Sequence, residues 1–553
     1  MKQPIIFALD DDPQVLKALA RDVRQQFRKE YKVLSTTSAS EALESLKTLK
    51  NQHEAIALFI CDQRMPEMPG VDFMEQAIKI YPDAKRVLLT AYSDTEAAIK
   101  AINAVGLHYY LLKPWDPPEE RLYPVLQDLL DEWQATFIPK WTGLRVIGNQ
   151  WSPKSHHLKD FLGANLFPFQ WLNVDEPNQA MELLRLNDLN ESQLPVVFFE
   201  DGSYLCQPEI PSIAQKLGLK SNATNSLYDV VLIGAGPAGL AGAVYGASEG
   251  LRTLLIDKRA PGGQAGSSSR IENYLGFPNG LSGSDLAHRA IVQATRLGTE
   301  FLSPQEVVEI RLQDQYKIIR LSNGSEISSR SIIITTGVDY RKLEAPGVEE
   351  FTGAGVYYGA AMIEAHAFKG KQVYIVGGGN SAGQAAMHLS KYAAQVYIII
   401  RKPDLSSTMS QYLINQIQGT TNIQLLPFTE VAEARGDQRL TCLVLSREQE
   451  KTTQTVPADA LFIFIGSKPF TDWIKLDIIK NPKGCVETGR DLQKYPLFQK
   501  TWKLPRDPYL LETCVPGIFA AGDVRAGAMN RVASAVGEGA MAIKYVHEYL
   551  AQT

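Results

Sequence analysis

Short apolar runs alternate with polar-faced segments along the N-terminal part of the chain. The runs IIFAL, ALFIC and RVLLT are each followed by turn residues and then by a helix-like pattern. Repeated strand–helix units of this kind predict a parallel sheet covered by helices, which we assign to a domain at residues 1–120. Residues 121–139 place Leu122, Leu129 and Trp133 near helical spacing, so we expect a connecting helix there.

A second, smaller unit of strands and helices is predicted at residues 140–220. It contains the strands LRVIG and FQWLNV, a helix between them, and a later strand and turn in LPVVFFEDG. From Tyr228 the chain restarts with a strand and a glycine-rich turn, and a second such turn follows further on. We therefore expect two nucleotide-binding domains, one formed by residues 228–346 and 470–553 and the other by residues 347–469. The predicted fold class is α/β throughout.

Composition narrows the class of protein. The chain has 553 residues, of which 45% are hydrophobic and 21% charged, as in ordinary globular proteins. A net charge of −5 gives no reason to expect nucleic-acid binding. The N-terminus lacks a signal-peptide pattern, and no apolar stretch approaches the roughly 18 residues of a membrane span, so we expect a cytoplasmic protein. None of the five cysteines lies in a CxxC pair, which indicates reduced thiols.

Charged side chains follow the predicted strands of the first domain. Asp10 and Asp11 follow IIFAL, Asp62 follows ALFIC, Thr90 ends RVLLT, and Lys113 follows YYLL. The carboxyl ends of parallel strands converge on one edge of a sheet, where ligands usually bind. Carboxylates there would attract Mg²⁺, and one of them could accept a phosphoryl group whose charge a lysine and a hydroxyl offset.

The segments ALDDDP, ICDQRMPEMPG, LLTAYSD and YYLLKPW resemble the four signature segments of a two-component receiver domain, which has a flavodoxin-like fold. The resemblance implies a histidine kinase or another phosphodonor as partner. It implies roles for six residues: a Mg²⁺ site at Asp10, Asp11 and Asp62, a phosphoacceptor at Asp62, a switch pair at Thr90 and Tyr110, and a phosphate-binding lysine at Lys113.

The unit at residues 140–220 resembles a thioredoxin or glutaredoxin domain. WSPKS stands where that family has W-C-P-x-C, and LPVVFFEDG matches the segment with the family's cis-proline, here Pro195. Ser152 and Ser155 take the two cysteine positions, and a serine hydroxyl cannot replace a thiolate in disulfide exchange. The remaining role is docking or spacing; the alternative interpretation is a generic α/β linker domain.

The first glycine-rich turn has the spacing of a dinucleotide site. Gly234, Gly236 and Gly239 follow the strand YDVVLI, and the strand TLLID ends at Asp257. Glycines at these positions permit a tight turn, let a pyrophosphate approach the backbone and let the helix pack on the strand. The acid at the end of the next strand would bind ribose hydroxyls.

The second glycine-rich turn has similar spacing, but the strand after it ends in basic residues. Gly377, Gly379 and Ala382 form G-x-G-x-x-A, and the following strand ends in Arg401 and Lys402 instead of an acid. Basic groups there would pair with a 2′-phosphate, so we predict NADPH over NADH. The alternative is that both are solvated surface charges.

These features, with GGQ, IENYLGFP, FIGSKP and FAAGDVR, resemble low-molecular-weight thioredoxin reductases over the C-terminal part of the chain. The resemblance implies FAD, NADPH and a homodimer. The residues implied to bind FAD are Gly234, Gly236, Gly239, Asp257, Gly263, Gln264, Asn273, Thr336, Gly337, Gly522, Asp523, Arg531, Val532 and Ala533. Those implied to bind NADPH are Gly377, Gly379, Asn380, Ser381, Ala382, Arg401 and Lys402.

The chain departs from that family at its redox centre. The cysteines of the family's C-A-T-C are replaced by Gly359 and Met362, and the following acid by Ile363. The family's RQA reads Arg531-Val532-Ala533, and Ser406 takes the place of the third basic residue of the 2′-phosphate motif. Cys485 and Cys514 would need Cα atoms within about 7 Å to substitute as a pair, and we do not expect this.

Three functions remain open at the level of sequence. The favoured one is an FAD-dependent NADPH oxidoreductase that passes electrons to an acceptor other than an internal disulfide: a quinone, an iron–sulfur or flavin protein, or oxygen. In the second, the flavin unit is a redox or nucleotide sensor or scaffold with little turnover. The third, a thioredoxin-disulfide reductase, needs a dithiol relay that the sequence does not contain.

Overall fold

The structure is a computed structural model, and it describes residues 3–52, 54–90, 105–137, 143–176, 179–268, 270–359, 365–447 and 452–553. It divides the chain into two compact units, residues 1–142 and 143–553. Each unit is described by itself.

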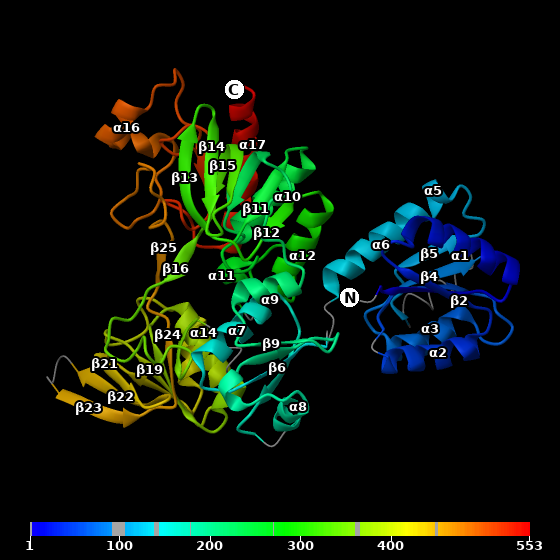
Figure 1. Ribbon diagram of the computed structural model, residues 1–553, viewed down its shortest axis with the longest axis horizontal. Coiled ribbons are helices and arrows are strands. Elements are labelled where there is room, and N and C mark those ends of the chain that lie inside the picture. Colours follow the sequence, from blue (N-terminus) through cyan, green and yellow to red (C-terminus); the bar gives the residue numbers. More distant parts are fainter. Residues whose placement is uncertain are drawn as a thin grey trace. The chain divides into compact units, whose positions relative to one another are not determined.

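The first unit has a five-stranded parallel sheet in the order β2-β1-β3-β4-β5 (Figure 1). Its strands are β1 (Ile5–Leu9), β2 (Lys32–Thr36), β3 (Ile56–Asp62), β4 (Lys85–Thr90) and β5 (Tyr109–Leu112). Its helices are α1 (Pro13–Phe27), α2 (Ala39–Asn51), α3 (Gly70–Ile80), α5 (Pro118–Arg121) and α6 (Tyr123–Thr136). β3 is buried along its whole length, as expected for a central parallel strand with both faces covered.

The helix that the sequence suggested as a connector belongs to this unit. Leu126, Leu129, Leu130 and Trp133 of α6 are buried with α1 against one face of the sheet, while α2 and α3 cover the other face. The apolar stripe of α6 therefore completes the core of this unit, beyond the predicted receiver segment at residues 1–120.

The second unit begins with a four-stranded module, defined here as residues 143–220. Its elements are β6 (Arg145–Gly148), α7 (Pro153–Ala164), β7 (Gln170–Asn173), α8 (Ala180–Leu186), η1 (Glu191–Gln193), β8 (Val196–Phe198), β9 (Tyr204–Cys206) and α9 (Ile210–Lys216). The sheet order is β7-β6-β8-β9, with β6 parallel to β7 and antiparallel to β8. The Leu194–Pro195 bond that precedes β8 is cis.

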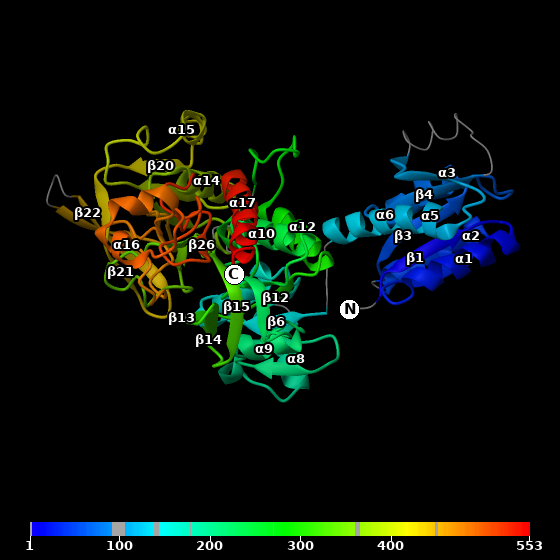
Figure 2. The same ribbon diagram turned by 90° about the horizontal axis from the view of Figure 1, so that it is seen from above.

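The first Rossmann-type domain (residues 227–337 and 470–553) has a seven-stranded sheet. Its strands run in the order β12-β11-β10-β15-β14-β13, and β26 pairs with β15. The strands are β10 (Leu227–Ile233), β11 (Thr253–Ile256), β12 (Glu300–Leu302), β13 (Val307–Gln313), β14 (Tyr316–Leu321), β15 (Glu326–Ile334) and β26 (Ile518–Ala520). The helices are α10 (Pro237–Ser248), α11 (Gly263–Gly266), α12 (Gly283–Arg296), η3 (Gly489–Lys494), α16 (Pro496–Thr501) and α17 (Val532–Leu550). α10 packs between α12 and α17 (Figure 2).

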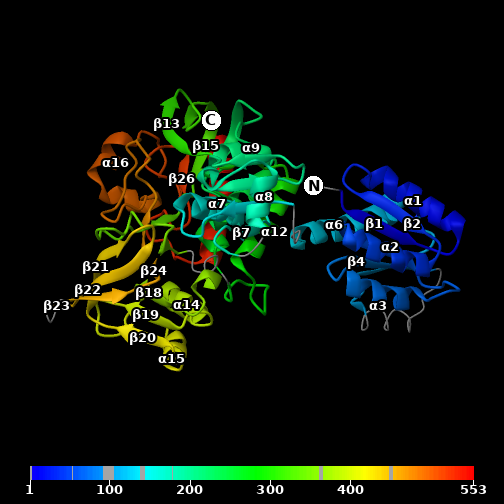
Figure 3. The same ribbon diagram turned by 60° about the horizontal axis from the view of Figure 1, so that its bottom comes forward.

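The second Rossmann-type domain (residues 341–466) has a parallel sheet in the order β17-β24-β18-β19-β20 beside an antiparallel sheet β21-β22-β23 (Figure 3). Its strands are β17 (Val356–Tyr358), β18 (Gln372–Val376), β19 (Gln395–Ile399), β20 (Ile423–Leu426), β21 (Thr429–Gly436), β22 (Leu440–Arg447), β23 (Thr452–Pro457) and β24 (Ala460–Ile463). Its helices are η2 (Ala365–Phe368), α14 (Asn380–Leu389) and α15 (Gln411–Gln418).

The chain passes between the two Rossmann-type domains through two short paired strands, β16 (Val338–Tyr340) and β25 (Ser467–Pro469). Leu343 and Ala345, which follow β16, pack against the core of the second domain. The border therefore falls at β16, a few residues before the predicted position at 346.

Candidate functional site

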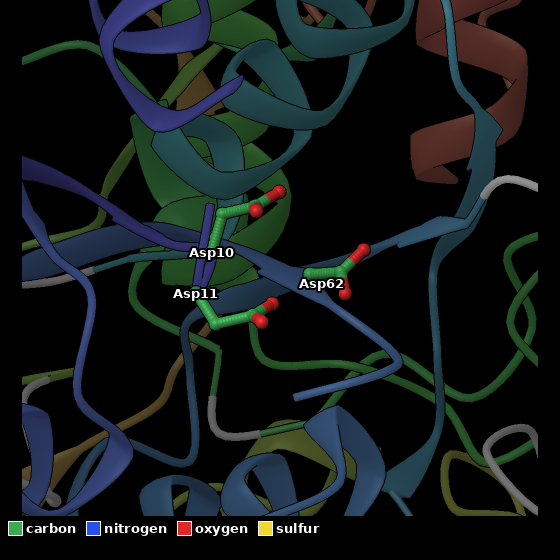
Figure 4. A group of neighbouring side chains, drawn as sticks. All are labelled: Asp10, Asp11 and Asp62. Carbon is green, nitrogen blue, oxygen red and sulfur yellow. The ribbon is translucent and has the colours of Figure 1, made fainter. Parts of the chain in front are cut away.

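The acidic residues predicted to form a metal site lie together at the carboxyl edge of the first sheet. Asp10 follows β1 and Asp62 ends β3, and the structure brings Asp11 beside them, with ligand atoms of the three carboxylates all within 4.8 Å of one another (Figure 4). Asp10 is fully buried and Asp62 is 6% exposed. Two buried carboxylates and the more exposed carboxylate of Asp11 supply the oxygen ligands that a hard cation such as Mg²⁺ prefers.

Lys113 supplies the positive charge at this edge. Its Nζ lies 2.7 Å from Asp10 Oδ2 and 2.5 Å from Asp62 Oδ1. Burial lowers the pKa of Lys113, but its hydrogen bonds to the two carboxylates outweigh burial and raise that pKa overall. Burial raises the pKa of Asp10, and Lys113 opposes that shift. The lysine thus offsets part of the charge that the two buried acids bring to this edge.

Near the three acids, Asp12 caps a helix, while Thr90 and Tyr110 form the predicted switch pair. Asp12 caps α1, because its carboxylate accepts from the backbone N–H groups of Gln14 and Val15. Thr90 is buried at the end of β4, level with the acids, while Tyr110 is half-buried on β5. The predicted switch pair therefore lies on two adjacent strands, with Thr90 on β4 next to β3 and Tyr110 on the edge strand β5.

The first glycine-rich turn has the shape that a pyrophosphate requires. Gly234 has φ of +105°, and a Cβ on it would lie 2.4 Å from the Thr335 carbonyl oxygen, so only glycine fits. Gly236 caps the N-terminus of α10, and a Cβ there would meet no atom within 4 Å. Open space at a helix N-terminus is suited to a phosphate group.

Asp257, at the end of β11, is fixed by the backbone. Its Oδ2 accepts from Ala235 N at 2.7 Å, and its Oδ1 accepts from the N–H groups of Arg259 and Ala260. Burial raises the pKa of Asp257, and these three backbone donors oppose the shift. The carboxylate therefore lies against the first turn, where the sequence predicted a ribose-binding acid.

The GGQ segment closes one side of this site. A Cβ on Gly263 would lie 2.8 Å from Gly236 Cα, so α11 abuts the first turn. Gln264 Nε2 donates to the Val338 carbonyl at 2.7 Å, and Thr336 Oγ1 donates to the Phe470 carbonyl at 2.8 Å. Both side chains hold the start of the β16–β25 connection in place.

Two of the residues predicted to bind FAD, Asn273 and Arg531, have exposed side chains. Asn273 is exposed on a loop, and Gly337 has φ of +60° just before β16. Arg531 is the N-cap residue of α17 and is exposed, and Val532 and Ala533 form the first turn of that helix.

Gly522 and Asp523 are held by two residues that sequence reasoning missed. Glu538 of α17 accepts from Gly522 N at 2.8 Å and forms an ion pair with Arg525 at 2.5 Å. Burial, and next the charge of Glu538, raise the pKa of Asp523. The spacing of Arg525 and Glu538 gives no sign of their pairing, because α17 returns to the turn only in the folded chain.

The second glycine-rich turn has the same geometry. Gly377 has φ of +137°, and a Cβ there would lie 2.3 Å from the Phe464 carbonyl oxygen. Gly379 caps α14, and a Cβ on it would meet nothing within 4 Å. Asn380 Oδ1 accepts from Ser410 N at 2.8 Å, and Ser381 and Ala382 continue the first turn of the helix.

Arg401 and Lys402 are both exposed just after β19. Arg401 Nε lies 3.6 Å from a Glu430 carboxylate oxygen, and Lys402 Nζ donates to Ser407 Oγ at 2.9 Å. Ser406 binds Asp404 instead of extending the basic group. Exposed pairs of this kind are weak, so both cations are available to an anionic ligand.

Gly359 is the residue that the sequence resemblance aligned with the family's first redox cysteine. It has φ of +72°, and a Cβ there would lie 2.5 Å from the Tyr340 hydroxyl. Met362 and Ile363 lie outside the described residues. All five cysteines are free, and Cys514 Sγ accepts from Ile479 N and donates to the Asp477 carbonyl. The alternative pair of Cys485 and Cys514 is thus not formed.

A glycine-capped helix follows a parallel strand in each Rossmann-type domain, α10 after β10 and α14 after β18, and this pair of turns is typical of oxidoreductases with two dinucleotide sites. A family model described as pyridine nucleotide-disulphide oxidoreductase matches residues 228–539, and the chain belongs to that family. A model described as response regulator receiver domain matches residues 6–122. The protein is therefore a receiver domain fused to a thioredoxin-reductase-like oxidoreductase.

Relatives and solved structures agree on the C-terminal part. The thioredoxin reductase of Bacillus subtilis is 32% identical over 328 residues, which are 59% of this chain and 95% of the relative. That of Listeria innocua is 31% identical over 325 residues, 59% of this chain and 94% of the relative. The Lactococcus lactis thioredoxin reductase structure has a TM-score of 0.53 at 29% identity, covering 59% of this chain and all of that chain. Among the described residues, no helix is long and apolar enough to cross a membrane.

Proposed function

We propose that the protein is an FAD-dependent NADPH oxidoreductase whose receiver domain controls it through phosphorylation, and that its electrons go to an acceptor other than an internal disulfide. The observation that carries the proposal is the pair of open helix N-termini at Gly236 and Gly379, combined with Gly359 in place of a redox cysteine. The first two indicate two bound dinucleotides, and the third removes the family's internal acceptor.

The residues of the first domain would bind FAD. The N-terminus of α10 would hold the pyrophosphate, Asp257 would bind ribose hydroxyls, and Gly522 and Asp523 would bind the ribityl chain. In the second domain, the N-terminus of α14 would hold the NADPH pyrophosphate, and Arg401 and Lys402 would pair with its 2′-phosphate. When bound, FAD supplies a ring that accepts hydride from NADPH. The protein supplies alignment and exclusion of water.

The receiver domain would supply the control. Asp10, Asp11 and Asp62 would hold Mg²⁺, and the Asp62 carboxylate would accept a phosphoryl group from a histidine kinase or another donor. Lys113, which now bridges Asp10 and Asp62, would move its contacts to the phosphoryl oxygens. Thr90 on β4 and Tyr110 on the edge strand β5 would change position in response.

The four-stranded module would be a thioredoxin-type domain without its redox cysteines. The sheet order β7-β6-β8-β9 and the helix that begins at Ser152–Pro153 support this assignment. Ser155 is fully buried, and its hydroxyl has no hydrogen-bond partner among the described residues. A hydroxyl there cannot exchange disulfides.

The test is anaerobic reduction of the FAD-loaded full chain by NADPH, followed by stopped-flow flavin absorbance. The reduced protein is then mixed with thioredoxin, ferredoxin, a quinone or oxygen. We expect rapid bleaching by NADPH, slower bleaching by NADH, and reoxidation by one non-disulfide acceptor. Arg401→Ala should reduce the preference for NADPH, whereas the control Arg447→Ala should not. Rapid reoxidation by oxidised thioredoxin, or no bleaching at all, would refute the proposal.

A further inference from the structure

The segment Trp151–Ser155, at the start of α7, contacts the second Rossmann-type domain (Figure 1). The Trp151 ring lies 5.9 Å from the buried Phe368 ring and packs with that domain's core. Lys371 Nζ and Arg439 Cζ each lie 4.7 Å from the centroid of Trp151. An aromatic ring between an apolar neighbour and two cations is a specific contact.

The next turn of α7 approaches the same domain closely. The His156 ring lies 5.2 Å from the Tyr357 ring, edge to face. A Cβ on the buried Gly353 would lie 3.1 Å from Pro153 Cα and 3.2 Å from His156 Cβ. The absence of a side chain at Gly353 lets the helix pack against the backbone that leads to β17.

The far half of α7 contacts the first Rossmann-type domain. Asp160 forms a close ion pair with Arg259, and Asn165 Nδ2 donates to the Arg259 carbonyl at 3.2 Å. Arg259 N in turn donates to Asp257 Oδ1 at 2.9 Å. The helix is therefore attached to the loop that also carries the candidate ribose-binding acid.

One helix thus contacts both Rossmann-type domains, which the chain itself connects through the paired strands β16 and β25. A two-stranded ribbon is a weak restraint on the relative orientation of two domains. We infer that the four-stranded module is a brace: α7 holds the two Rossmann-type domains in one orientation, and the segment at the former redox position serves as its docking contact.

The contact residues suit this role because they are separate from the module's own core. Trp151 packs with the second domain, while the module's cores are formed by other residues such as Leu158, Phe161 and Val197. Removing the Trp151 ring should therefore release the brace without unfolding the module. Burial, and next the charge of Arg439, lower the pKa of Lys371, which agrees with a closed contact.

The experiment is hydrogen–deuterium exchange of the full, FAD-loaded chain, compared between variants. Trp151→Ala and Asp160→Asn each remove one end of the brace. Both should speed exchange about tenfold in β16, β25 and residues 353–358, the change given by a loss of roughly 1.4 kcal/mol. Tyr204→Ala and Asp201→Asn are matched controls on the module, since Asp201 pairs with Lys216 within it, and they should leave those regions unchanged.

Arg439→Gln tests the same contact from the second Rossmann-type domain. Because Arg439 is not part of the four-stranded module, this substitution should not affect the folding of the module. It should reproduce the effect of Trp151→Ala on β16 and β25, and combining the two should add little because both remove one contact. Unchanged exchange in β16 and β25 in all three variants, or faster exchange confined to residues 143–220, would overturn the brace. Neither result depends on the electron acceptor or on turnover.

Discussion

The carboxyl edge of the receiver sheet and the start of α7 in the four-stranded module both follow the end of a strand, but they differ in the side chains that they carry. At the receiver edge, Lys113 bridges the buried carboxylates of Asp10 and Asp62 and offsets part of their negative charge. At the start of α7, Ser152 only caps the helix, Ser155 is buried without a partner, and Trp151 packs on another domain. The end of a strand in an α/β sheet can thus carry a cluster of charged side chains in one domain and make packing contacts in another.

The largest effect should come from the phosphoacceptor. Asp62→Asn removes the carboxylate proposed to form the acyl phosphate, so phosphoryl incorporation from a small phosphodonor should fall to background. The measurement is intact-protein mass after treatment with the donor and Mg²⁺. Asp83→Asn, an exposed acid between α3 and β4, is the control and should be phosphorylated normally. Equal incorporation in both variants would remove Asp62 from this role.

Lys113→Met should give the next largest effect. Without the ammonium, the buried carboxylates of Asp10 and Asp62 face each other uncompensated, and the free energy of unfolding of the receiver unit should fall by about 3 kcal/mol in Mg²⁺-free buffer. Native-state exchange of the amides of β1 and β3 measures it. Added Mg²⁺ should restore part of the loss, whereas the exposed Lys79→Met should behave as wild type. A loss that Mg²⁺ does not change would mean that the acids do not bind it.

The serines of the module should respond in opposite directions. Ser152→Ala removes the N-cap of α7 and should cost about 1 kcal/mol. Ser155→Ala removes a buried hydroxyl without a partner and should be neutral or stabilising by up to about 1 kcal/mol. Exchange protection of β6 and α7 distinguishes the two. If Ser155→Ala were as costly as Ser152→Ala, its hydroxyl would have a partner.

The smallest effect should be a pH dependence confined to the receiver. Burial, and next the charges of Arg86 and Lys85, lower the pKa of His108 to about 4. The unfolded chain therefore binds more protons as the pH falls from about 6.5 to about 4, and receiver stability should fall in that window, by about 0.5–1 kcal/mol after solvent screening. His108→Asn should remove this slope in pH-dependent exchange of β4 and β5. An unchanged slope would assign the dependence to other groups.

The parts of the site that sequence could predict are those set by short-range patterns. Asp10 and Asp62 follow apolar runs, and the convergence of parallel strands places them together, as the structure shows. The G-x-G spacing predicted tight turns at Gly234 and Gly377, and in the structure the backbone at both positions leaves room only for glycine. The resemblance to known families extended these assignments along the chain.

The parts that sequence missed join residues from distant segments. Glu538 of α17 accepts a hydrogen bond from the backbone N–H of Gly522, and Tyr340 of β16 lies against Gly359. α6 had the periodicity of a helix, but periodicity cannot state which core a helix completes. A pattern in one segment carries no information about the segment that it will contact.

The sequence by itself determined the α/β class, the order of the receiver and oxidoreductase domains, the candidate ligands and the absence of a CxxC pair among the five cysteines. Each of these depends on local residue type and spacing. Only the tertiary structure decided that Lys113 bridges two buried acids, that α6 belongs to the receiver core, and that α7 contacts both Rossmann-type domains. Burial, ion pairing and packing depend on which surfaces meet, and those contacts exist only in the folded chain.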